Sequence, residues 1–173
     1  QADLADFDGL RRIVRDLSPG LIVNAAAYTA VDRAEEEEDL AFAVNGRAPG
    51  ILAEEASRIG SPIVHFSTDY VFDGTSHRPA REDDPTAPLN VYGQSKLAGE
   101  EAIRDSGCSY LIFRTSWVYS MRGRNFLLTV KRLAGELEEL RVQAEENRSG
   151  IEMHGSGRKT KRLLVATNLG QSM

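Results

Sequence analysis

Cysteines, histidines and long apolar runs are scarce in this sequence. The single cysteine, Cys108, excludes an internal disulfide and is typical of a reducing compartment. The three histidines, His65, His77 and His154, show no metal-ligand spacing, and His65 lies within a predicted strand, where a core position is expected. No apolar run approaches the roughly 18 residues that a membrane helix needs, and no secretory signal is recognisable. We therefore expect a cytoplasmic protein.

Positive charge is not in excess either. The sequence has 21 Lys and Arg against 26 Asp and Glu, which gives a net charge of -5 and a pI near 5.3. This balance argues against a nucleic-acid partner or an anionic membrane surface. The rest of the composition is ordinary for a globular protein, with 41% hydrophobic residues in 173. A chain of this length can form one domain that buries roughly 70% of its unfolded surface.

Short apolar runs alternate with helical patterns along most of the chain. The apolar runs predict buried strands at residues 21–27, 62–68, 109–116 and 140–143. Helical patterns occupy residues 6–17, 34–45, 48–60, 90–103 and 125–140. The crossovers are long enough for parallel pairing, so we predict an α/β fold with a doubly wound, Rossmann-like parallel sheet.

Three residues near the predicted strand ends combine into a possible reaction site. Thr68 ends a strand, and Tyr92 and Lys96 are spaced i and i+4, which places them on one helical face. A lysine ammonium near a tyrosine is expected to lower the phenol pKa from its ordinary value of about 10. A threonine hydroxyl across the crevice can bind a carbonyl oxygen that gains negative charge. The spacing Tyr-x-x-x-Lys alone also arises by chance, so its position beside Thr68 matters.

Four longer motifs extend this pattern: VNAAAYTAVDRAE, VHFSTDYVFDGT, PLNVYGQSKLAGE and FRTSWVYSMRGRNFLLT. Together they resemble the dTDP-4-dehydrorhamnose reductases, a branch of the extended short-chain dehydrogenases/reductases. The resemblance covers residues 2–142. It implies NADPH- or NADH-dependent reduction of the 4-keto group of dTDP-4-dehydro-β-L-rhamnose to dTDP-β-L-rhamnose, in a possible homodimer. It allows Mg²⁺, but no metal-ligand motif is visible in the sequence.

The resemblance also implies roles for individual residues. Tyr92 would donate the proton and also contact the cofactor. Lys96 would lower the pKa of Tyr92 and bind the nicotinamide ribose, and Thr68 would tune the proton donor and bind the same keto oxygen. Asp69 and Trp117 would contact the substrate. The remaining cofactor contacts would come from the chain start and from the loop after the first strand, namely Asp3, Leu4, Ala27, Tyr28 and Thr29.

The chain departs from the family pattern at both ends. The family begins with a strand and a glycine-rich turn for the cofactor pyrophosphate, which we do not find here. After residue 143 the sequence no longer resembles the family's substrate-binding lobe. We therefore expect residues 1–143 to form a partial NAD(P)-binding domain with the catalytic residues, and residues 144–173 to be poorly structured. We also expect the chain to be an inactive piece of a longer protein.

Two other interpretations remain open. A nucleotide-sugar epimerase or dehydratase shares the Thr, Tyr and Lys pattern, and Asp69 is compatible with it. A non-catalytic, NAD(P)-binding regulatory subunit is the alternative outside enzymes, because a fold does not fix a function.

Overall fold

The computed structural model describes residues 3–116, positions 128 and 132, and three later strands at residues 139–142, 150–154 and 162–166. The chain divides by internal contacts into two units. Residues 1–73 and 83–115 form the first, and residues 74–82 and 116–173 form the second. This division does not coincide with the predicted boundary at residue 143, which stays a prediction.

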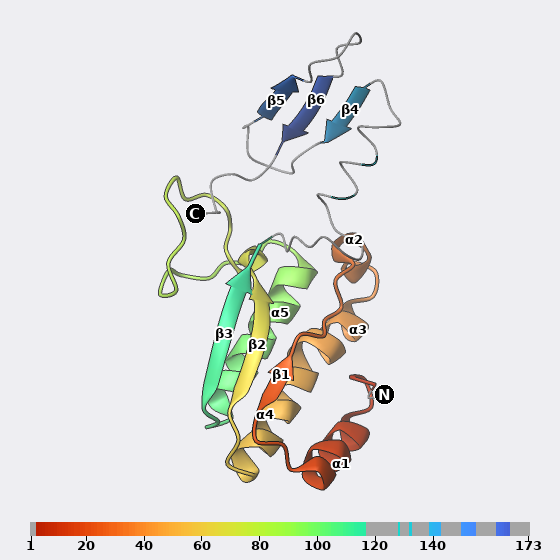
Figure 1. Ribbon diagram of the computed structural model, residues 1–173, viewed down its shortest axis with the longest axis vertical. Helices are drawn as coiled ribbons and strands as arrows, with labels where there is room; N and C mark the ends of the chain where they lie inside the picture. The colour runs from red at the N-terminus through yellow and green to blue at the C-terminus, as the bar shows by residue number, and fades with distance from the viewer. Residues whose placement is uncertain are drawn as a thin grey trace. The chain divides into compact units, whose positions relative to one another are not determined.

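The first unit is built on a three-stranded parallel sheet in the order β1-β2-β3. Its strands are β1 (Ile22–Asn24), β2 (Ile63–Thr68) and β3 (Tyr110–Thr115). Their carboxyl ends lie at the same edge of the sheet, and α4 and α5 cover one face (Figure 1). The predicted α/β fold with a Rossmann-like parallel sheet is confirmed, although the first strand is shorter than residues 21–27.

Helix α1 (Phe7–Leu17) follows its sequence signals closely. The Asp6 side chain caps its start by accepting a hydrogen bond from the Gly9 amide at 2.9 Å. The helix ends at Ser18, whose left-handed backbone (φ 40°) precedes Pro19. Leu10 and Val14 are buried on the face that packs on α4.

The segment between β1 and β2 begins as a loop and then becomes mostly helical. It comprises α2 (Val31–Ala34), α3 (Glu38–Phe42), the π-helical turn η1 (Ala43–Arg47) and α4 (Ala48–Arg58). Pro49 lies at the junction of η1 and α4, and its missing N–H favours a local change in the hydrogen-bond ladder. Gly60 follows α4 with φ +69°, as expected for a residue just past a helix end.

The main core lies between the helices and the sheet. It is formed by Leu10, Val14, Ala48, Ile51, Leu52, Ala53, Ala56, Ile63, Ile103 and Cys108. On the other face of the sheet, Val23, Phe66, Leu111 and Phe113 are exposed. The rings of Phe66 and Phe113 lie 5.6 Å apart in neighbouring strands.

The second unit contains a separate small sheet in the order β4-β6-β5. Its strands are β4 (Glu139–Val142), β5 (Gly150–His154) and β6 (Arg162–Ala166). The predicted fourth strand therefore exists, but it pairs with β6 and not with the main sheet. Strands β5 and β6 lie inside residues 144–173, for which the sequence predicts little structure. Among the described residues, no helix is long and apolar enough to cross a membrane.

Candidate active site

The site begins where β2 ends. Thr68, 5% exposed, is the last residue of β2 and caps the short 3-10 helix η2 (Asp69–Val71). Its Oγ1 accepts a hydrogen bond from the Tyr70 amide at 3.2 Å and donates to Oδ1 of Asp69 at 3.2 Å. The hydroxyl is thereby held at the carboxyl end of the central strand, where ligands of open α/β sheets bind.

Helix α5 (Val91–Asp105) brings Tyr92 to this strand end. Asn90 caps the helix by accepting from the Gly93 amide at 2.7 Å. A Cβ built on Gly93 would overlap the carbonyl oxygen of Tyr70, so only glycine allows α5 to approach η2 this closely. The rings of Tyr70 and Tyr92 meet edge to face, with centroids 5.6 Å apart.

Tyr92 lies close enough to the Thr68 hydroxyl and the Asp69 carboxylate for both groups to act on the pKa of its phenol. Burial raises the pKa of Tyr92 above its ordinary value; the Thr68 hydroxyl opposes the shift and the nearby Asp69 carboxylate adds to it. The expectation that Lys96 lowers the pKa of Tyr92 is therefore wrong for this structure. The Tyr92 phenol stays protonated at neutral pH.

Lys96 turns its amine away from bulk water and toward β2. The side chain is 1% exposed, and Nζ donates to the carbonyl oxygen of Phe66 at 2.6 Å and lies 3.3 Å from Nε2 of His65. Burial lowers the pKa of Lys96 to about 8, and the carboxylate of Glu100 on the next helical turn partly opposes this shift. These contacts explain why the ammonium does not act on Tyr92 here.

Glu100 continues the buried polar stripe that starts with Tyr92 and Lys96 on α5. It is fully buried and pairs with Arg104 and Arg114, each at 2.7 Å. Burial alone would raise the pKa of Glu100, but the hydrogen bonds and charges of these arginines hold it below its ordinary value. The carboxylate ties α5 to β3 and places a negative charge behind Lys96.

The loop after β1 is fixed by a residue of the π-helical turn. Asn45, 1% exposed, accepts from the Tyr28 amide at 2.9 Å and donates to the Tyr28 carbonyl at 3.0 Å. Its amide also donates to Ser95 Oγ at 3.1 Å, and Ser95 donates to the Tyr92 carbonyl at 2.8 Å. The Tyr28 phenol donates to Glu37 at 2.5 Å, and this bond raises the pKa of the phenol. The loop and the start of α5 are thus tied together through Asn45.

A family model described as the RmlD substrate binding domain matches residues 1–150 of the 173-residue chain. The chain belongs to this family. The resemblance to dTDP-4-dehydrorhamnose reductases inferred from the motifs is confirmed.

Individual relatives agree with the assignment. The dTDP-4-dehydrorhamnose reductase of Burkholderia thailandensis is 53% identical over 146 residues, which cover 84% of this chain and 49% of that protein. A similar solved structure is that of the Bacillus anthracis dTDP-4-dehydrorhamnose reductase in complex with NADP. Its sequence is 39% identical, and the TM-score is 0.77 over 81% of this chain and 50% of that one. The Bordetella bronchiseptica enzyme WbmG, in complex with NAD and UDP, is 26% identical, with a TM-score of 0.60 over 66% and 36%. The chain spans about half the length of the curated relatives it matches.

Within this RmlD-family chain, the predicted site residues fall into three groups. Thr68, Asp69 and Tyr92 are in contact or close to one another, and Lys96 lies one helical turn along α5. The loop carrying Ala27, Tyr28 and Thr29 is linked to α5 through the Asn45 network. In the third group, Asp3 accepts a hydrogen bond from the Ala5 amide and Leu4 packs on the core. Trp117 lies outside the described residues.

Sequence reasoning missed two residues of the network. Asn45 lies in a predicted helix, and the signal that could have revealed it is Pro49 four residues later, which disturbs the helical ladder at Asn45. Glu100 lies eight residues after Tyr92, so Tyr92, Lys96 and Glu100 occupy positions i, i+4 and i+8 on one face of α5. This spacing could have indicated Glu100. His65 is buried, as expected within a strand, but it contacts Lys96.

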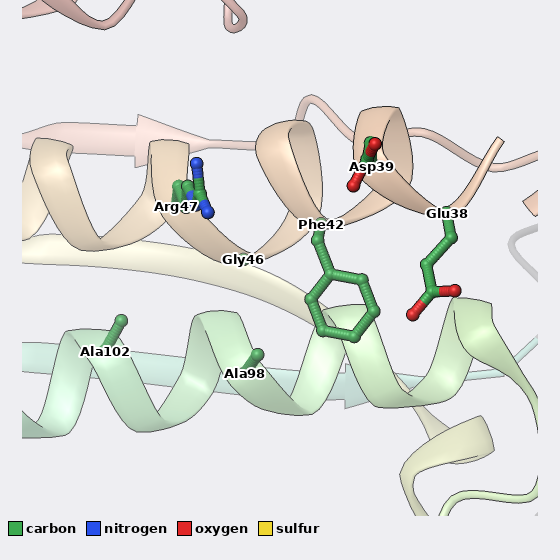
Figure 2. Close-up of a pocket in the computed structure, with 7 residues that line it drawn as sticks. All are labelled: Glu38, Asp39, Phe42, Gly46, Arg47, Ala98 and Ala102. Atoms are coloured by element: carbon green, nitrogen blue, oxygen red, sulfur yellow. The ribbon is translucent and has the colours of Figure 1, made fainter.

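The structure also has a pocket of about 410 Å³ between α3, η1 and α5 (Figure 2). It is lined by Glu38, Asp39, Phe42, Gly46, Arg47, Ala98 and Ala102. None of these residues belongs to the Thr68–Tyr92–Lys96 group, so this pocket is separate from the candidate active site. Among the residues that the structure describes, no group of three or more His, Cys, Asp or Glu is arranged to hold a metal ion.

Proposed function

We propose that the protein containing this chain reduces the 4-keto group of dTDP-4-dehydro-β-L-rhamnose to dTDP-β-L-rhamnose with NADPH or NADH. The observation that carries the proposal is the convergence of three side chains at the end of β2. Thr68 ends this strand, Tyr92 packs on Tyr70 of η2 at a ring distance of 5.6 Å, and Lys96 lies one turn further along α5. Membership of the RmlD family and the dTDP-4-dehydrorhamnose reductases among its relatives support the same reaction.

The residues present fit the nicotinamide-ribose end of a dinucleotide. An ammonium has three N–H donors. Lys96 donates one to the Phe66 carbonyl and contacts His65 with a direction that depends on the ring tautomer, so at least one donor is left for a ribose hydroxyl. The small side chains of Ala25 and Ala26 are exposed in the loop that Asn45 fixes, where a flat ligand can approach the backbone. A reduced nicotinamide, when bound, supplies the hydride. Asp3 and Leu4 are proposed to lie near the adenosine half.

Tyr92 is suited to donate the proton to the substrate oxygen. Its raised pKa keeps the phenol protonated at neutral pH, so a proton is available for transfer. The Thr68 hydroxyl has one proton, which it donates to Asp69 in this structure, and we propose that it turns toward Tyr92 during the reaction. When it turns toward Tyr92, it stabilises the phenolate that remains after transfer, which is the direction of its effect on the pKa of Tyr92.

The substrate contacts are proposed for Asp69 and Trp117. Asp69 follows Thr68 directly and is partly exposed, so its carboxylate is accessible to a sugar hydroxyl. We further propose that the protein acts in the cytoplasm on a dTDP-sugar and forms a homodimer.

Product analysis tests the proposed reaction. The natural protein that contains this chain is incubated with dTDP-4-dehydro-β-L-rhamnose and either NADPH or NADH, and cofactor oxidation is followed together with the sugar product. The proposal requires one cofactor oxidised for each dTDP-β-L-rhamnose formed. A changed sugar without net cofactor oxidation would instead indicate an epimerase, and binding of cofactor without any reaction would indicate a regulatory subunit.

A further inference from the structure

The amine of Lys96 has a partner that the proposed reaction does not use. His65 is fully buried on β2, and its Nε2 lies 3.3 Å from Nζ of Lys96. The other ring nitrogen, Nδ1, lies 3.1 Å from Nδ2 of Asn24 on β1. Oδ1 of Asn24 in turn accepts from the Ala26 amide at 3.3 Å. A line of contacts therefore runs from the loop after β1 through two strands to the amine on α5.

The protons on His65 and Lys96 determine the direction of each hydrogen bond between Asn24, His65 and Lys96. A neutral imidazole has one N–H and one acceptor nitrogen, so it cannot accept from both Asn24 and Lys96. A protonated Lys96 only donates, which requires an acceptor at Nε2 and the ring proton at Nδ1 of His65. A neutral Lys96 amine can accept from Nε2–H instead, and Nδ1 then accepts from the Asn24 amide nitrogen, as its contact with Nδ2 requires.

We propose that His65 is a positioning residue for Lys96, and that the tautomer of its ring changes together with the proton on the Lys96 amine. In the protonated state, Asn24 turns its amide by half a rotation so that Oδ1 accepts from Nδ1–H. In the neutral state, Oδ1 returns to the Ala26 amide. The protonation state of Lys96 is thereby coupled to the hydrogen bond between Asn24 and the loop after β1, and the importance of this coupling for catalysis rests on the function proposed above.

The electrostatic surroundings support a neutral ring. Burial, reinforced by the charge of Lys96, lowers the pKa of His65 to about 3. Glu100 on α5 opposes this shift for His65 and also favours the charged form of Lys96. Among the described residues, β1 contributes the uncharged amide of Asn24 to this line, and Arg114 of β3 pairs with Glu100 at 2.7 Å. The proton that moves near neutral pH is therefore that of Lys96.

The tautomer can be measured directly on the 173-residue chain, without any variant and without turnover. Nitrogen-15 NMR of the labelled chain distinguishes Nδ1–H from Nε2–H, and exposed His77 provides an internal reference. We expect His65 to be neutral throughout, with Nδ1–H well below pH 8 and Nε2–H well above it, because the pKa of Lys96 is about 8. An Nε2–H ring on both sides of this pH overturns the proposal.

Substitutions give a second test, in which the Lys96 titration is followed by the carbon-13 shift of its Cε. His65→Leu removes the acceptor and should lower the pKa of Lys96 by about one unit, a tenfold change in its acid dissociation constant. His65→Gln can present an amide oxygen near the position of Nε2 and should keep the wild-type pKa, as should His77→Gln. A Lys96 pKa in His65→Leu that equals or exceeds the wild-type value overturns the proposal.

The tests of the coupling between His65 and Lys96 can be distinguished from the test of the proposed reaction. If the natural protein shows no reductase activity, the proposed function fails and these titrations keep their meaning. If the titrations fail, the reaction can still use Lys96 without His65. If His65→Leu does not fold, the wild-type tautomer measurement still decides the proposal.

Discussion

Replacing Gly93 by alanine tests whether the close approach of α5 to η2 creates the active-site geometry. The added Cβ would overlap the carbonyl oxygen of Tyr70 and lie 3.0 Å from Cβ of Pro88. Backbone on one side and a proline ring on the other leave no flexible side chain to move aside. The helix must shift away from η2 by on the order of 1 Å to restore ordinary contact distances.

The magnitude follows from two opposing effects. Overpacking of this kind costs about 1–3 kcal/mol. The better helix propensity of alanine returns at most about 1 kcal/mol. We therefore expect the free energy of unfolding to fall by about 0–3 kcal/mol. The shift also separates Tyr92 from Thr68, and a displacement of about 1 Å between reacting groups can lower turnover about 100-fold.

Gly46→Ala is the matched control, because it adds a methyl group to another helix that packs on α5. The nearest atoms to its Cβ would be Cβ of Ala98 and the carbonyl oxygen of Ser95, both at 3.5 Å, which is ordinary contact. Urea unfolding of the chain and turnover of the natural protein measure the two effects. If Gly93→Ala is as stable and as active as Gly46→Ala, the contact between α5 and η2 does not set the site geometry.

Three further predictions concern the buried polar residues. Glu55 is fully buried and binds Arg15 through two hydrogen bonds of 2.7 and 2.6 Å. In a urea titration, Glu55→Gln should therefore lower the free energy of unfolding by about 1–3 kcal/mol. The control Glu54→Gln, at an exposed position, should have little effect. The Arg15 hydrogen bond keeps the pKa of Glu55 below its ordinary value despite burial. The stabilisation by this ion pair is therefore present above pH 4.5 and is lost as the pH falls through the lower folded-state pKa of Glu55. Equal acid unfolding of the wild type and Glu55→Gln would contradict this prediction. Because the pKa of Lys96 is about 8, cofactor affinity should fall as the pH rises through that value, and Lys96→Met should bind cofactor weakly with no such pH dependence. Asn45→Ala should release the loop at Tyr28 and raise the cofactor KM more than it lowers kcat, and a selective loss of kcat would assign Asn45 another role.

Local signals explain why much of the fold could be predicted from the sequence. The apolar run before Thr68 contains almost no turn-forming residue, and β2 lies within one residue of the predicted range. Asn90 caps α5 at the position where the helical pattern begins, so Tyr92 and Lys96 fall on the predicted face. Such features depend on neighbours in the sequence, which is the information that periodicity and capping rules use.

Tertiary contacts explain what could not be predicted. The i, i+4 spacing of Tyr92 and Lys96 indicates a shared face but not the direction of the amine, which is set by the Phe66 carbonyl and His65 on another strand. The sign of the shift in the pKa of Tyr92 depends on burial, which a local pattern does not contain. The separate pairing of β4 with β6 likewise depends on a partner more than twenty residues away along the chain.

The most direct test of the central claim is the turnover of Tyr92→Phe in the natural protein that contains this chain, with Tyr110→Phe as the matched control on exposed β3. The loss of a general acid should lower kcat for dTDP-4-dehydro-β-L-rhamnose by about 10²–10⁴-fold. Cofactor affinity should stay the same, because the proposed ribose contact is Lys96. Near-normal turnover of Tyr92→Phe, comparable to that of Tyr110→Phe, would contradict the assignment of Tyr92 as the proton donor.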